Sequence, residues 1–78
     1  MPTILILGPY RFHFYSTDRR EPPHVHVTAP DGNAKFWLQP VSLAFSEKLN
    51  ASDLRKITVL VHQHSEDFLE AWHDYFDD

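Results

Sequence analysis

The chain has 78 residues, including two Trp, six Phe and three Tyr, and its formal net charge is −4. A chain of this length forms one domain that buries only about 60% of its unfolded surface, so its core must be small and rich in large side chains. The lack of cysteine excludes a disulfide framework and a thiolate site, and the negative charge argues against a broad phosphate-binding surface.

The first apolar segment, residues 3–7, is far too short to cross a bilayer and lacks the basic flank of a signal peptide. We therefore expect a cytoplasmic protein without membrane contact. No internal repeat or low-complexity segment divides the sequence. We expect a single domain over residues 1–78, with a β meander in residues 1–40 and a helical part in residues 50–76.

Residues 1–40 show the alternation and the turn residues that are typical of β-strands. The predicted strands are residues 3–7, 11–16, 24–29 and 34–38. Pro40 should end the fourth strand, because proline cannot donate to a ladder. For residues 41–46 the pattern is compatible with a short irregular strand or with a turn of helix.

Residues 50–76 show a helical pattern that begins with a good N-cap sequence at Asn50 and Asp53. Large side chains then recur every three or four residues, at Leu54, Ile57, Val61, His64, Phe68, Trp72 and Tyr75. Ser65 can cap a second helix, so one long helix or two consecutive helices are both allowed. The sequence thus predicts an α+β domain in which an antiparallel sheet of about four strands packs against a C-terminal helical segment.

Matching the apolar faces predicts how the strands pair, since a slip of one residue turns every apolar side chain of a strand outward. A loop over residues 30–33 sets Val27 opposite Phe36. A three-residue turn after the first strand sets Ile6 opposite Phe12. The helical segment then covers the apolar face.

The other face of the predicted sheet gathers polar and aromatic side chains. If the second and third strands pair antiparallel, matching Phe14 with Val25 sets His13 opposite His26 and Tyr15 opposite His24. The same face carries four more candidates for binding or catalysis: Arg11, Tyr15, Lys35 and Trp37. We expect this face to be exposed, so that replacing its histidines costs little stability.

Four segments have a recognisable pattern: YRFHFYS (10–16), EPPHVHV (21–27), AKFWL (34–38) and LEAWHDYF (69–76). They resemble the bacterial domain-of-unknown-function family numbered 4160, and the Pro-Pro-His-Val-His-Val block is the most specific of them. The resemblance implies a short prokaryotic protein that is often encoded beside a small partner, in neighbourhoods like those of toxin–antitoxin pairs or mobile elements. It implies neither an established reaction nor a catalytic residue.

The first of three functional hypotheses is a metal-independent, RNA-cleaving toxin. His24 or His26 would transfer protons, because imidazole titrates near neutral pH, and Lys35 or Arg11 would stabilise the negative charge on phosphorus. Contacts with the bases and the rest of the substrate would come from four residues: Tyr15, Trp37, Arg19 and Arg20.

The second hypothesis is a protein-binding module, in which this face or an exposed sheet edge receives the small partner protein. The third is a weak zinc-binding protein that uses His24, His26 and His13. A structural zinc site normally has four ligands, and the sequence offers no cysteine to complete one. Only this third hypothesis requires a cofactor, and all three leave the oligomeric state open.

Overall fold

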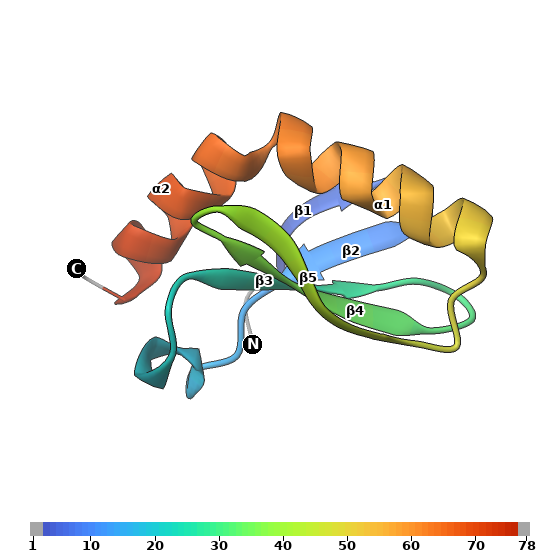
Figure 1. Ribbon diagram of the computed structural model, residues 1–78. Coiled ribbons are helices and arrows are strands. Elements are labelled where there is room, and N and C mark those ends of the chain that lie inside the picture. The colour runs from blue at the N-terminus through green and yellow to red at the C-terminus, as the bar shows by residue number, and fades with distance from the viewer. Residues whose placement is uncertain (1–2, 77–78) are drawn as a thin grey trace.

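In the computed structural model, which describes residues 3–76, the chain forms a five-stranded sheet followed by two helices (Figure 1). The strands are β1 (Thr3–Leu7), β2 (Tyr10–His13), β3 (His24–Thr28), β4 (Asn33–Leu38) and β5 (Val41–Glu47). Each strand pairs antiparallel with the next one in the chain. The predicted α+β architecture is confirmed, although the sheet has one strand more than the predicted four or so.

The additional strand is β5, in the region where the sequence allowed either a strand or a helical turn. Pro40 lies in the short turn after β4, and the chain then reverses so that Val41 pairs with Leu38. Pairing continues to Glu47 opposite Asn33. This ladder pairs the backbone groups of β5 that face β4, which explains why the segment is a strand.

The helical segment consists of two consecutive helices, α1 (Ala51–Gln63) and α2 (Ser65–Phe76), which lie together on one side of the sheet (Figure 1). As predicted, Asn50 caps α1, and its side chain accepts a hydrogen bond of 2.7 Å from the backbone N–H of Asp53. The break falls at His64, whose backbone N–H still donates to the carbonyl of Leu60. Neither helix has the length and apolar character needed to cross a lipid bilayer.

The core lies between the sheet and these helices. Phe12 stacks on Phe68 with ring centroids 5.1 Å apart, and Phe14 meets Trp72 edge to face at 5.3 Å. Ten apolar residues of the predicted strands and of the predicted helical segment are all buried: Phe12, Phe14, Val25, Val27, Phe36, Leu38, Ile57, Val61, Phe68 and Trp72. The assignment of the two sheet faces is therefore correct for the central strands.

The predicted pairing is wrong for β3 and β4, although the faces are right. Phe36 lies opposite Val25 rather than Val27, because the four-residue loop covers residues 29–32 and not residues 30–33. The different loop position shifts every residue pair between β3 and β4 by two residues relative to the prediction. A shift of two keeps each side chain on its own face, so the apolar set remains buried.

The predicted pairing of β1 with β2 is wrong by one residue, and here the faces change. The turn contains only Gly8 and Pro9, with Gly8 at φ 58°, so Leu5 rather than Ile6 lies opposite Phe12. Ile6 lies opposite Arg11 and is 65% exposed. The register then shifts again between Thr3 and Leu5.

Candidate functional site

The polar face of the sheet is covered by a loop formed by residues 14–23, which we call the covering loop. The sequence pattern extends the second strand to residue 16, but β2 ends at His13 and the chain leaves the sheet there. The loop contains a short 3-10 helix, η1 (Asp18–Arg20), which lies on the side of the sheet opposite α1 and α2 (Figure 1). It returns to the sheet at His24, after Pro22 and Pro23.

This cover buries part of the polar face. The expectation of an exposed histidine face is wrong for two of its three members, because His13 is 1% exposed and His24 is 0% exposed. The side chain of His26 retains an exposure of 16%. Trp72 of α2 and Trp37 of β4 also enclose the His24 ring, at centroid distances of 5.0 and 5.5 Å.

The strands bring the three histidines together. Antiparallel pairing of β2 with β3 sets His13 opposite His26, as predicted, and their rings stack at a centroid distance of 5.7 Å. His24 and His26 share a face because they are two residues apart on one strand, and their rings meet edge to face at 5.1 Å. Tyr15, just beyond β2, lies edge to face with His26 at 4.5 Å.

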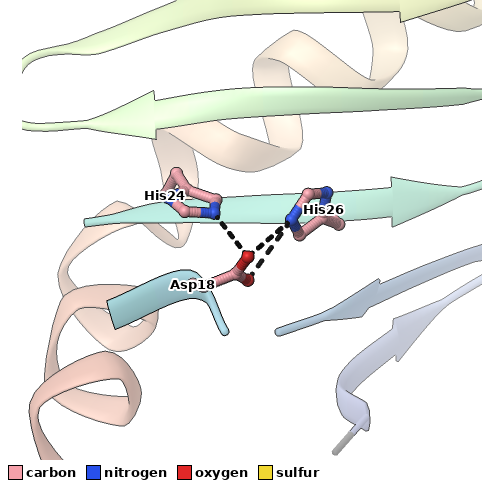
Figure 2. A group of neighbouring side chains, drawn as sticks. All are labelled: Asp18, His24 and His26. Atoms are coloured by element: carbon pink, nitrogen blue, oxygen red, sulfur yellow. Dashed lines mark hydrogen bonds and ion pairs between the residues drawn. The ribbon is translucent and has the colours of Figure 1, made fainter. Parts of the chain in front are cut away.

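Asp18 joins two of these histidines into what we call the Asp–His cluster, formed by Asp18, His24 and His26 (Figure 2). Its Oδ1 lies 3.1 Å from Nε2 of His24, and both of its oxygens lie 3.3 Å from Nε2 of His26. The backbone N–H of Tyr15 donates to Oδ2 at 2.7 Å and fixes the carboxylate. The three ligand atoms lie within 4.8 Å of one another, and Asp18 is 7% exposed.

His13 lies beside this cluster and outside it. Its Nε2 hydrogen-bonds to the hydroxyl of Thr28 at 2.9 Å, away from Asp18. Within residues 3–76 its Nδ1 is buried and has no hydrogen-bond partner. The carboxylate of Asp18 therefore occupies the place beside His24 and His26 that the zinc hypothesis gave to His13.

The environment controls the charge of these groups. Burial, with the charges of Arg11 and His26, lowers the pKa of His13 to about 4. Burial also lowers the pKa of His26, and contact with Asp18 offsets this only in part. Burial by itself would raise the pKa of Asp18, but the hydrogen bond from the Tyr15 N–H and the nearby imidazoles of His24 and His26 outweigh it and hold that pKa below its ordinary value.

An exposed ion pair borders the cluster. Lys35 Nζ donates to Glu21 Oε1 at 2.7 Å, and this contact lowers the pKa of the Glu21 carboxyl. The same Oε1 lies 3.8 Å from Nε2 of His24. Lys35 Nζ also lies 4.5 Å from the centre of the Trp37 ring, so both predicted site residues of β4 are already engaged within the protein.

A polar cleft of about 360 Å³ opens beside His26. His13 and Tyr15 line it together with the β3–β4 hairpin, which contributes Thr28, Asp31 and Asn33. Arg11 of β2 lies opposite Thr28 of β3. Its charge is close enough to His13 to lower the pKa of that ring. Arg19 and Arg20 are exposed on η1.

The sequence pattern identified the strand histidines and missed Asp18. One signal was available: before Asp31, Asp18 and Glu21 are the sole acidic residues of the sequence, and both lie in the loop that precedes the His-Val-His strand. Periodicity assigns strand residues to the two faces of a sheet, but it does not predict how a loop folds back onto the sheet. The position of Asp18 beside the two histidines therefore could not be predicted from periodicity.

Comparison with known proteins identifies the family. No curated protein and no solved structure is significantly similar to the chain. One family model, described as a domain of unknown function (DUF4160), matches residues 10–73, a range that includes the covering loop and the Asp–His cluster. The chain therefore belongs to the DUF4160 family.

Proposed function

We propose that the protein is an RNA-cleaving enzyme whose reactive centre is the Asp–His cluster. The observation that carries this proposal is the position of His26, which belongs both to the buried cluster and to the wall of the polar cleft. A reactive group must reach its substrate, and it must also be held in a fixed orientation. His26 meets both requirements, because Asp18 holds its Nε2 while its ring borders the cleft.

The fully buried His24 has a different role in this proposal. Its ring is 0% exposed, and its Nδ1 hydrogen-bonds to the carbonyl oxygen of Pro22 at 2.9 Å. A ring enclosed in this way does not touch a substrate. We therefore assign His24 to positioning Asp18, and we assign the contact with the substrate to His26.

The volume of the cleft and one aromatic side chain support a short nucleotide segment as the substrate. A volume of about 360 Å³ lies at the small end of the range for ligand sites, which runs from about 300 to 1,000 Å³. Tyr15 lines the cleft, is 42% exposed and offers an aromatic surface on which a base can stack. Among the described residues, the lining contains Asp31 and no Arg or Lys, so the positive charge for phosphate groups would come from Arg11, Arg19 and Arg20 outside the lining.

Cells need a means of restraining an RNA-cleaving enzyme. We propose that this protein acts in the cytoplasm as the toxin of a toxin–antitoxin pair, with the small product of a neighbouring gene as its partner. The net charge of −4 fits an enzyme that makes a few local phosphate contacts better than one that tracks along a long nucleic acid.

The test is cleavage of a labelled single-stranded RNA by the purified chain. We expect His26→Gln to reduce the rate by about 100-fold or more, because it removes the imidazole that contacts the substrate. His62→Gln, the same replacement at an exposed position on α1, should leave the rate unchanged. Absence of cleavage by the wild-type chain, or equal rates for His26→Gln and the wild type, would refute the proposal.

A second candidate function is a protein-binding module, and a separate surface favours it. An apolar groove of about 580 Å³ lies between the β1–β2 turn and α1, lined in part by Leu7, Val59 and Leu60. Arg55 and Lys56 border it, so its best-matched occupant is a partner segment with both apolar and acidic side chains. The neighbouring edge strand β1 adds free backbone groups for strand pairing.

A further inference from the structure

We propose that Asp18, His24 and His26 bind a divalent transition-metal ion, with Asp18 Oδ1 and the Nε2 atoms of both histidines as its ligands. These three residues are also the reactive centre of the proposed function. The inference that they bind an ion rests on their geometry and holds whether or not the protein cleaves RNA. Only the use of the ion in RNA cleavage rests on the proposed function.

The contact of His24 with Pro22 fixes the position of the hydrogen on the His24 ring. A carbonyl oxygen only accepts hydrogen bonds, so Nδ1 of His24 must carry the ring hydrogen that it donates to Pro22 at 2.9 Å. In the neutral ring, Nε2 then presents a lone pair. This lone pair lies 3.1 Å from Asp18 Oδ1, which is itself rich in electrons. Two such atoms repel each other unless a positive charge lies between them.

This nitrogen is also buried without a hydrogen-bond partner in the part of the chain that the structure describes. Nε2 of His24 is enclosed, and within residues 3–76 it makes no aligned hydrogen bond, although it lies close to Asp18. Buried polar atoms in folded proteins nearly always have a partner, and an orphaned one calls for an unseen group. The atom faces the centre of the Asp–His cluster (Figure 2).

The ligand atoms are spaced nearly as in a metal site. Ligands held at about 2.0–2.2 Å from one ion in ideal tetrahedral geometry lie about 3.3–3.6 Å apart. The distance from Asp18 to His26 is 3.3 Å, which matches this spacing, and the distance from Asp18 to His24 is 3.1 Å, slightly below it. The two histidine nitrogens, within 4.8 Å of each other, need to draw somewhat closer.

Neighbouring backbone groups orient the ligands. A metal-binding histidine usually donates its other ring hydrogen to a backbone carbonyl or a carboxylate, and His24 does so to Pro22. The N–H of Tyr15 donates to Oδ2 of Asp18, and Oδ1 lies close to the Nε2 atoms of both histidines. The pair Pro22-Pro23 stiffens the chain directly before the ligands.

The donor set predicts which ions bind. Two imidazoles and one carboxylate suit zinc and neighbouring transition metals, whereas magnesium and calcium prefer sites made wholly of oxygen. Three protein ligands leave one position open, as in catalytic zinc sites. Because His26 also lines the polar cleft, this open position would be available to a water molecule and a phosphodiester.

The test is calorimetric titration of the full chain, freed of metal by chelation, with zinc chloride and with magnesium chloride. We expect one zinc ion per chain with a dissociation constant of about micromolar or tighter, and no heat with magnesium. Asp18→Asn and His24→Gln should each weaken zinc binding at least tenfold. His62→Gln should bind as the wild type does, because it replaces an exposed histidine away from the cluster.

A second measurement covers the case in which the variants fail to fold. In the wild-type chain, zinc should shift the NMR signals of the Nε2 atoms of His24 and His26 and leave those of His62 in place. No binding, equal binding by all variants, or shifts confined to exposed histidines would overturn the metal site, and a proton on His24 would then account for the contact with Asp18.

The zinc titration and the RNA-cleavage assay together separate the metal site from the proposed function. A chain that binds one zinc ion at the cluster but leaves RNA intact supports the metal site and refutes the enzyme. A chain that cleaves RNA fully in the presence of a chelator, and binds no zinc, supports the enzyme and overturns the metal site.

Discussion

The hydroxyl of Tyr10 donates a hydrogen bond of 2.9 Å to Oδ1 of Asp53. Tyr10 begins β2 and Asp53 lies in the first turn of α1, so this bond joins the sheet to the start of the helical layer. The Tyr10 ring is 6% exposed. A bond between a buried hydroxyl and a carboxylate is stronger than one between neutral groups, because one partner is charged.

Tyr10→Phe should therefore lower the free energy of unfolding by about 1–2 kcal/mol at pH 7. The replacement keeps the ring and removes only the hydroxyl. Urea denaturation measures the loss, and Tyr75→Phe, at a residue that is 42% exposed, is the matched control with an expected change within about 0.5 kcal/mol. Equal effects at the two positions would show that the bond to Asp53 contributes nothing.

The same tyrosine should make stability depend on alkaline pH. Burial raises the pKa of Tyr10, and its hydrogen bond with Asp53 and the charge of that residue raise it further. The unfolded chain releases this proton at about pH 10, whereas the folded chain still retains it. Stability from this group is thus fully present below pH 10 and is lost as the pH rises towards the folded value.

Denaturation at pH 9 and pH 11 checks this dependence. The wild type should lose more stability over this interval than Tyr10→Phe does, because the variant has no proton to release at this position. Parallel losses for the two proteins would contradict the prediction.

Replacing the two strand histidines should have unequal effects on stability. His24 is fully buried against two tryptophan rings, so we expect His24→Gln to cost about 2–4 kcal/mol. The His26 side chain retains some exposure, and His26→Gln should cost about 1 kcal/mol. Urea denaturation in the presence of a chelator measures both values without a contribution from bound metal, and two equally small losses would contradict the buried position of His24.

Partner binding tests the second candidate function at three surfaces. Ile6→Asp changes a residue of β1 that is 65% exposed, so it should leave the fold intact and weaken binding of the neighbouring gene product by about 2 kcal/mol or more. Leu43→Asp, on the opposite edge strand β5, is the matched control and should bind normally. A loss caused by Trp37→Ala alone would point to the polar face instead, as the sequence-based hypothesis of a binding module expects.

The part of the fold set by alternation could be predicted from the sequence. Matching Phe14 with Val25 across two antiparallel strands was enough to set His13 opposite His26, because strand periodicity is rigid. The same reasoning failed for Ile6, where a two-residue turn and a register shift in β1 replaced the assumed three-residue turn. Turn length sets register, and the pattern of apolar residues alone did not determine it.

The candidate site was predictable only in part, for the same physical reason. His24 and His26 share a face because they are two residues apart on one strand. The burial of that face depends on residues 14–23, whose path is set by particular contacts such as the bond from Tyr15 N–H to Asp18. Such contacts produce no periodic pattern of residues, so they cannot be predicted from the spacing of side chains in the sequence.

The covering loop has a further consequence for how the site opens. Asp18 is buried, whereas its neighbours Arg19 and Arg20 are exposed on the same short helix. Trypsin cuts after arginine, but it must first draw several residues of extended chain into its active site, which requires local unfolding. Unfolding of η1 also removes Asp18 from His24 and His26, so the rate of tryptic cleavage in this loop measures how often the cluster comes apart.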